Sequence, residues 1–145
     1  MARMVDISKK KDVPRRSVAS GEIVLAPATV RAMRAGKVPK GDPISTAEVA
    51  GLQAVKKVWE ALPHCHPIPI TSASVEFAVK NDRVAVTCEV RATYKTGVEM
   101  EALYACTVAL LTIWDMVKSL EKDEAGQYPL TRIQNVRVVM KAKGT

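Results

Sequence analysis

The sequence predicts an α+β fold in which helices pack on one face of an antiparallel sheet. Apolar residues alternate with other residues in 75–79, 84–90 and 136–140, as expected of strands that bury one face. Residues 46–61 and 97–121 instead place apolar side chains three and four positions apart, as helices do. With a first strand upstream, the order strand, helix, two strands, helix, strand is that of the ferredoxin-like split β-α-β arrangement.

The N-terminal part is expected to supply the first strand and a short helix. Residues 1–14 are charged and include Pro14, so we expect them to form a flexible segment. The apolar residues within 16–25 predict the first strand. Pro27 can begin a short helix, and Gly36 can end it.

A longer helix is expected next. Its approach, residues 37–43, is a predicted loop because it is rich in proline and glycine. Ser45 and Glu48 fit a capping box, so the helix should run from about Thr46 to Ala61. Prolines within 63–69 exclude regular structure after it. The residues expected on its buried face are Ala47, Gly51, Ala54, Val55, Val58 and Leu62.

The second half should form a hairpin, a long helix and a last strand. A turn at 80–82 joins the two hairpin strands. Thr96 and Glu99 fit a second capping box at the start of the long helix, 97–121. One face of the sheet would stay bare in a monomer, so we expect an oligomer. The buried face predicted for the long helix is Leu103, Thr107, Leu110, Trp114 and Val117.

The composition is that of one soluble domain spanning residues 1–145, with 48% hydrophobic and 26% charged residues. No uncharged apolar run approaches the roughly 20 residues of a membrane helix, and the N-terminus lacks the apolar core of a secretory signal. We therefore expect a cytoplasmic protein. An odd number of cysteines argues against a disulfide framework, and Cys88 and Cys106 fall on apolar faces, where we expect core residues.

The net charge of +7 favours an anionic partner, whether nucleic acid, anionic lipid or a phosphorylated metabolite. Aromatic residues make up only 4% of the chain, and Phe77 is the one phenylalanine. Such a sequence has little material for stacking nucleic-acid bases, which disfavours RNA binding.

Two carboxylates at the start of the long helix are candidate site residues. Acidic side chains in a first turn stabilise the helix dipole, and the capping box gives Glu99 a structural role. Glu101 has no such explanation. Lys95 lies just upstream, so a cation and two acids are close in sequence, which favours a site.

His64, Cys65 and His66 lie between two prolines and are a second candidate cluster. A metal site is one interpretation, although adjacent ligands without a second cluster close a tetrahedron poorly. A proline-locked loop with incidental histidines is another. The third interpretation, which we prefer, is a rigid loop that presents His66 and backbone amides to a ligand. Cys65 as a nucleophile would need a lowered pKa and a paired base.

Charged side chains on the last third of the long helix form a third candidate. Asp115 and Lys118 are three residues apart and share a face, as a surface ion pair would. Asp115 also continues a largely apolar stripe from Glu101, so partly dry surroundings could tune it for acid–base chemistry. Loop residue Lys40 can meet a phosphate. Lys56, Lys95 and Lys141 could extend a phosphate-binding surface, or simply be solvated.

These motifs together resemble one known family. Lys40-Gly41-Asp42, His64-Cys65-His66-Pro67, the run from Lys95 to Leu103, and Asp115-Met116 with Lys118 follow the order and spacing of the cyclic pyranopterin monophosphate synthases of molybdenum cofactor biosynthesis. The similarity covers roughly residues 4–143. The nine-residue run Lys-Thr-Gly-Val-Glu-Met-Glu-Ala-Leu is the most specific of these motifs.

The resemblance implies a lyase that converts 3′,8-cyclo-7,8-dihydro-GTP, made by a radical SAM enzyme, to cyclic pyranopterin monophosphate with release of pyrophosphate. It implies a homo-oligomer, a hexamer built from dimers, with sites between subunits. No cofactor is required, although Mg²⁺ can accompany the triphosphate, and no membrane, nucleic acid or bound metal is implied. The implied catalytic residues are Asp115, Lys118 and Lys40, and the implied substrate-binding residues are His64, Cys65, His66, Met100 and Glu101, with Glu99 beside them. Lys56 and Lys141 complete the predicted substrate-binding residues as candidate phosphate-binding lysines.

The chain departs from the family pattern in its loops. His64 replaces a common leucine, Pro39 precedes Lys40, and Pro43 replaces a common valine. A non-catalytic nucleotide- or RNA-binding module of ferredoxin-like fold is the alternative function. A metalloprotein that uses the histidine–cysteine loop is a third hypothesis.

Overall fold

The computed structural model describes residues 1–144, so the predicted domain 1–145 ends one residue beyond the described part. The described residues form four strands and four helices. In chain order these are β1 (Val13–Val24), α1 (Pro27–Arg34), α2 (Pro43–Val55), α3 (Val58–Ala61), β2 (Ile70–Val79), β3 (Arg83–Tyr94), α4 (Glu99–Glu121) and β4 (Arg132–Lys143).

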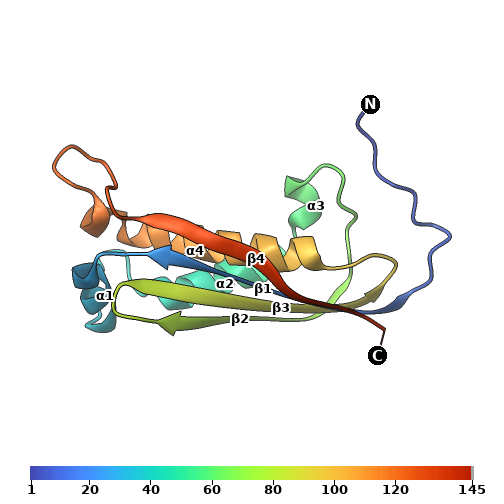
Figure 1. Cartoon of the computed structure of the whole chain (residues 1–145), viewed down its shortest axis with the longest axis horizontal. Helices are drawn as coiled ribbons and strands as arrows, with labels where there is room; N and C mark the ends of the chain where they lie inside the picture. The colour runs from blue at the N-terminus through green and yellow to red at the C-terminus, as the bar shows by residue number, and fades with distance from the viewer. Residues whose placement is uncertain (145) are drawn as a thin grey trace.

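The four strands form one antiparallel sheet in the order β2-β3-β1-β4. Because β3 lies between β1 and β2 and is antiparallel to both, the first β-α-β unit is split by a strand from later in the chain. Helices α2 and α4 lie behind the sheet, α1 lies at one end, and α3 lies towards the other (Figure 1). The predicted α+β fold is confirmed.

The core lies between the sheet and α4. Alternate residues of β3 point inwards and are fully buried, among them Val86 and Val90. Cys88 and Cys106 are also fully buried, so their predicted place in the core is confirmed. Four of the seven fully buried residues of α4 are small, which lets neighbouring elements approach the helix closely: Ala102, Ala105, Cys106, Ala109, Leu110, Ile113 and Val117.

The buried face predicted for the long helix was therefore only partly right. Leu110 and Val117 are buried, but Leu103 and Trp114 are only half-buried and Thr107 is exposed. Leu110, Ile113 and Val117 lie in the core with the small residues, whereas Leu103 and Trp114 pack against its edge. By length and composition alone α4 could cross a membrane, yet half of its apolar window is buried, as in the core helix of a soluble protein.

The helix starts also differ from the capping-box predictions. Helix α2 begins at Pro43, within the predicted loop, because Asp42 caps it by accepting a hydrogen bond from the Ile44 N–H at 3.0 Å. Ser45 instead donates its hydroxyl to Asp42. Helix α4 begins at Glu99 after Val98, with no side-chain cap from Thr96.

The helix predicted from Thr46 to Ala61 is broken in two. It stops at Val55, and the four-residue α3 follows after Lys57. The predicted buried positions up to and including Val58 are buried, but Leu62 is exposed because the chain leaves helical geometry at that residue, after the short α3.

The open face of the sheet is charged rather than apolar. Arg16 is 2.6 Å from Glu89, which also pairs with Arg91 at 2.8 Å, and Arg83 is 3.0 Å from Glu22. In one chain this face is uncovered, as expected, but it is not the apolar surface we expected, because most residues of β1 and β3 that point away from the helices are polar or very small. Large exposed apolar side chains are found on the helices, among them Val49, Met100 and Leu111, and on the edge strand β4 of the same sheet, at Val136, Val138 and Val139.

Candidate functional site

One cluster of predicted site residues lies towards the C-terminal end of α4. Lys40, from the loop before α2, places its Nζ 3.3 Å from both carboxylate oxygens of Asp115 and 3.1 Å from its carbonyl oxygen. Lys118 Nζ is 3.0 Å from Asp115 Oδ1. The structure therefore joins the three predicted catalytic residues as one carboxylate between two ammonium groups.

The charges of this trio stabilise one another in an exposed setting. Hydrogen bonds from Lys118 and then Lys40 lower the pKa of the Asp115 carboxyl, and Asp115 raises the pKa of Lys118. The Asp115 side chain is 59% exposed. The expectation of partly dry surroundings is therefore wrong for the single chain, because the stripe between Glu101 and Asp115 faces away from the core.

An apolar hollow of about 310 Å³ adjoins the trio. It is lined by Leu111, Trp114, Ile133 and the two helix residues of the trio. The Trp114 ring meets the Tyr128 ring edge to face, with centroids 5.1 Å apart. Tyr128 lies in the loop after α4, so this loop supports one wall of the hollow.

A second cluster lies at the N-terminal end of α4. The loop before β2 and the first turn of the helix enclose a hollow of about 130 Å³. This hollow brings together six of the predicted substrate-binding residues, and one of them, Glu99, pairs with a seventh, Lys141. Its lining is His64, Cys65, His66, Ile68, Thr96, Gly97, Glu99, Met100 and Glu101.

Glu101 is the buried acid of the second cluster. Its side chain is 4% exposed, and burial raises its pKa to about 7, with a smaller contribution from Glu99. Burial and the nearby Glu101 also raise the pKa of the Cys65 thiol. The structure therefore disfavours Cys65 as an ionised nucleophile and makes Glu101 a group that can exchange a proton near neutral pH.

Glu99 faces the same hollow, and Lys141 is the cation that pairs with it among residues 1–144. Its Oε1 is buried without a hydrogen bond, and the Nζ of Lys141 on β4 lies 3.4 Å away, close enough for an ion pair only. The Glu99 carboxylate folds back over Gly97, where an added Cβ would collide with it. The glycine of the Lys-Thr-Gly motif therefore makes room for this carboxylate.

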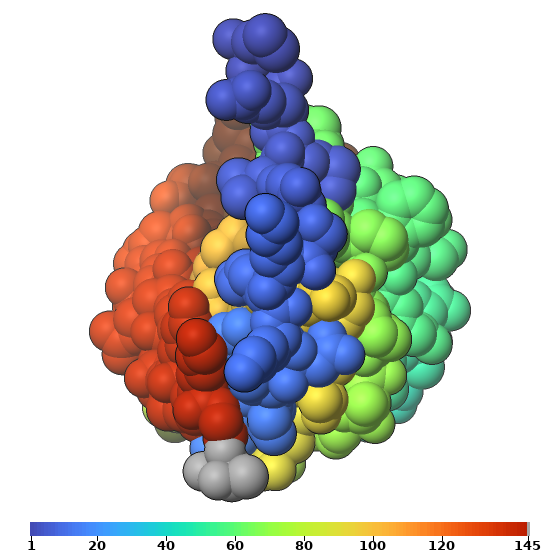
Figure 2. All heavy atoms as spheres, turned by 90° about the vertical axis from the view of Figure 1, so that its right-hand side faces the viewer, coloured from blue at the N-terminus to red at the C-terminus, as the bar shows by residue number. Residues whose placement is uncertain are grey.

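Both histidines contact the N-terminal segment. His64 Nδ1 lies 2.5 Å from the Arg3 carbonyl oxygen, and His66 Nε2 lies 2.9 Å from that of Val5. Each of these ring nitrogens must carry a proton, because a carbonyl oxygen can only accept. Figure 2 shows the segment running along this end of the molecule and projecting beyond it. No group of three His, Cys, Asp or Glu side chains suited to a metal ion occurs in residues 1–144.

Sequence reasoning missed this contribution of the N-terminus. Lys95 donates to the Lys10 carbonyl oxygen at 3.2 Å, and buried Arg15 donates to the carbonyls of Tyr94 and Lys95. The first strand starts at Val13 rather than residue 16, which brings Arg15 into the sheet. The high charge of residues 1–14 was the available signal, and it was interpreted as flexibility.

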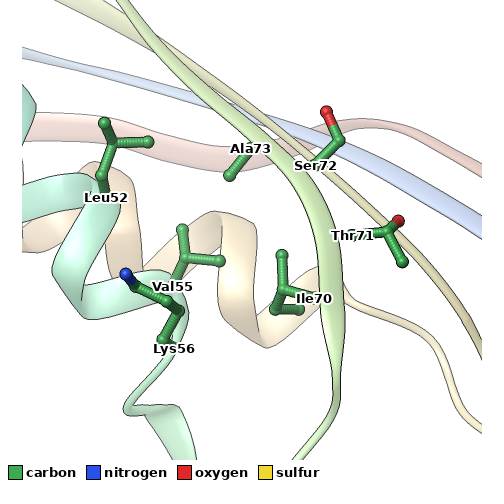
Figure 3. A pocket seen from close by; sticks show the side chains of 7 residues that line it. All are labelled: Leu52, Val55, Lys56, Ile70, Thr71, Ser72 and Ala73. Atoms are coloured by element: carbon green, nitrogen blue, oxygen red, sulfur yellow. The ribbon is translucent and has the colours of Figure 1, made fainter.

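Lys56 lies apart from both clusters. It follows α2 and lines a hollow of about 250 Å³ against the start of β2 (Figure 3). Leu52 and Val55 face the same hollow from α2, and Ile70 faces it from the strand. Within one chain, Lys56 therefore joins neither the Asp115 trio nor the histidine loop.

The two clusters are also far from each other. Fourteen residues of one helix separate Glu101 from Asp115, which at about 1.5 Å per residue is about 21 Å. A single chain does not bring the predicted catalytic and substrate-binding residues into one small pocket.

Comparison with known proteins is consistent with the motifs. The MoaC family model matches residues 4–144. The chain belongs to the MoaC family. A relative from Thermococcus onnurineus is 56% identical over 97% of this chain and 90% of its own, and one from Pyrococcus abyssi is 57% identical over 97% and 89%. A relative from Methanosarcina mazei is 55% identical over 99% and 91%. Each is described as a probable cyclic pyranopterin monophosphate synthase.

The range matched by the MoaC family model includes both ends of α4. The matched range contains the Asp115 trio, the histidine loop and the Lys-Thr-Gly-Val-Glu-Met-Glu motif. The family resemblance based on these motifs is confirmed.

Proposed function

We propose that this protein is a cyclic pyranopterin monophosphate synthase. It converts 3′,8-cyclo-7,8-dihydro-GTP to cyclic pyranopterin monophosphate and releases pyrophosphate, an early step of molybdenum cofactor biosynthesis. The observation that supports this most is the joining of Lys40, Asp115 and Lys118 within a chain of the MoaC family. This is a lyase reaction on a small phosphorylated molecule, as the charge of +7 favours.

The chemistry of the two clusters fits such a reaction. Two ammonium groups beside one carboxylate can stabilise charge that develops on a leaving pyrophosphate. Glu101, with a pKa of about 7, can exchange protons while a ring system is opened and rebuilt. We assign six residues that line or adjoin its hollow to substrate binding: His64, Cys65, His66, Glu99, Met100 and Lys141. Lys56 is assigned there only as a candidate phosphate-binding lysine.

A complete site would need two copies of the chain. Clusters about 21 Å apart on one helix can face each other only if a second subunit supplies one of them. The helix layer exposes apolar side chains at Val49 and Leu111, which are 56% and 57% exposed. Such exposed apolar surface supports a contact between copies. We propose a homo-oligomer, a hexamer built from dimers, that works in the cytoplasm on the product of a radical SAM enzyme.

The direct test is to incubate the purified protein with the cyclised GTP substrate and quantify pyrophosphate and pterin product. We expect stoichiometric amounts of both, and parallel reactions with Mg²⁺ and with a chelator show whether the metal is needed. A folded oligomer that forms neither product would contradict the proposal. The alternative, an RNA-binding module, predicts binding that weakens steeply with salt, and titration of RNA into the same preparation tests it.

A further inference from the structure

Glu121 is a buried carboxylate at the last residue of α4, outside the motifs described above. It is 8% exposed, and its oxygens accept four contacts. The Ala26 N–H lies 3.1 and 3.2 Å from its two oxygens, the Thr131 hydroxyl donates at 2.6 Å, and the Thr29 hydroxyl also donates. A buried carboxylate surrounded by donors is a fixed point of the structure, because losing it leaves several polar groups without partners.

These donors come from segments distant in sequence. Ala26 and Thr29 belong to the start of α1, whose N-cap residue offers no side-chain cap of its own. Thr131 ends the loop that connects α4 to β4. A carboxylate in the last turn of α4 opposes the dipole of its own helix, but here it lies at the N-terminus of α1, where a negative charge is favoured. Glu121 therefore joins α4, α1 and the loop before β4.

Each of these segments leads to the Asp115 trio. Lys118 is three residues before Glu121 on the same helix. The loop that follows α1 contains buried Val38 and then Lys40, whose ammonium group reaches Asp115. The loop that Thr131 ends holds Tyr128 against Trp114 beside the trio. One buried carboxylate thus holds in place all the segments that supply the trio and its aromatic wall.

We propose that Glu121 is a positioning residue for the reaction at Lys40, Asp115 and Lys118, acting by fixing α1 and the 122–131 loop against the end of α4. This inference rests on the proposed function. Glu121 touches none of the reacting groups, so its effect should appear in turnover and in the ionisation of Asp115 rather than in substrate binding.

Glu121→Gln is the primary test, because the amide keeps the shape but its nitrogen cannot accept the Thr and backbone hydrogen bonds. Loosening the trio should lower kcat by about 10- to 100-fold with little change in KM. The pKa of Asp115, measured by ¹³C NMR of aspartate-labelled protein and assigned with Asp115→Asn, should rise towards its ordinary value. Lys118 and Lys40 are the groups that lower the pKa of Asp115, and Tyr128 lies close enough to Lys118 to raise the pKa of that lysine.

Glu124→Gln, an exposed glutamate three residues later, is the matched control and should change neither quantity. If Glu121→Gln does not fold, Thr29→Val and Thr131→Val, which each remove one donor, replace it with the same expectation. Unchanged kcat and unchanged Asp115 pKa in a folded variant would overturn the inference, and so would a rise in KM alone. A wild type that makes no product contradicts the proposed function instead, and the NMR titration then decides about Glu121 by itself.

Discussion

The two ends of α4 each present a carboxylate in a predicted functional cluster, and the two carboxylates are held in opposite ways. Asp115 is exposed, and two lysines lower its pKa. Glu101 is buried without a paired cation among the described contacts, and burial raises its pKa to about 7. The same chemical group is thus fixed in its charged form at one end and poised between its two forms at the other.

This contrast separates two kinds of work. A carboxylate with a lowered pKa holds cations in place but accepts protons poorly near neutral pH, whereas a group with a pKa near 7 exchanges them well. Asp115 is therefore suited to organising Lys40 and Lys118, and Glu101 to moving protons. The sequence analysis placed the main acid–base role at Asp115 and Lys118 and a binding role at Glu101, and this assignment of roles stays a prediction.

Removing the charge at Asp115 should have the largest effect. Asp115→Asn leaves Lys40 and Lys118 without their shared anion, so kcat for pyrophosphate release should fall by about 10²- to 10⁴-fold. Stability should change little, because the side chain is exposed. Glu76→Gln, an exposed acid on β2, is the control with the same loss of charge and should keep full activity. Full activity of Asp115→Asn would remove this residue from the mechanism.

Replacing Glu101 should have an effect on stability that depends on pH. A folded-state pKa of about 7, above the ordinary 4.5, means that the native state holds its proton more tightly than the unfolded state. The wild type should therefore lose stability as pH rises from about 4.5 to 7. The pKa shift corresponds to about 3 kcal/mol of folding stability that the wild type loses over this range. Glu101→Gln mimics the protonated acid and should not lose this stability.

Urea unfolding of both proteins at pH 5 and pH 8 measures this difference. The free energy of unfolding of Glu101→Gln should exceed that of the wild type only at pH 8. Glu48 is an exposed acid on α2, and Glu48→Gln should have the same free energy of unfolding as the wild type at both pH values. An equal difference between Glu101→Gln and the wild type at both pH values would show that Glu101 is not titrating in the native state.

The smallest expected effect concerns two predicted substrate-binding lysines. Lys141 faces Glu99 at the second cluster, whereas Lys56 faces a separate hollow. Lys141→Gln should raise KM several-fold, by about 1 kcal/mol of binding, with stability nearly unchanged because the ion pair is half-exposed. Lys56→Gln should raise KM less, unless a second subunit brings Lys56 into the site. Steady-state kinetics of the two variants side by side distinguish these outcomes.

Much of the fold could be predicted from the sequence, because strand and helix periodicities are local and strong. The hairpin of β2 and β3, the long helix ending at Glu121 and the antiparallel sheet followed from these patterns. The helix starts did not, because capping residues compete: Asp42 with Pro43 caps α2, and neither predicted capping box forms. A cap depends on the entry angle of the chain, which the remaining contacts decide.

The sequence by itself determined the family motifs and the residue types available for chemistry. Only the tertiary structure decided which acid is buried, since Glu101 and Asp115 occupy equivalent helical faces in sequence but different surroundings in space. It also decided that Lys40 reaches Asp115 across 75 residues, that Lys56 does not join the trio, and that Glu121 holds α1 to α4. The physical reason is that burial, and with it the pKa, depends on atoms contributed by segments far apart in the chain.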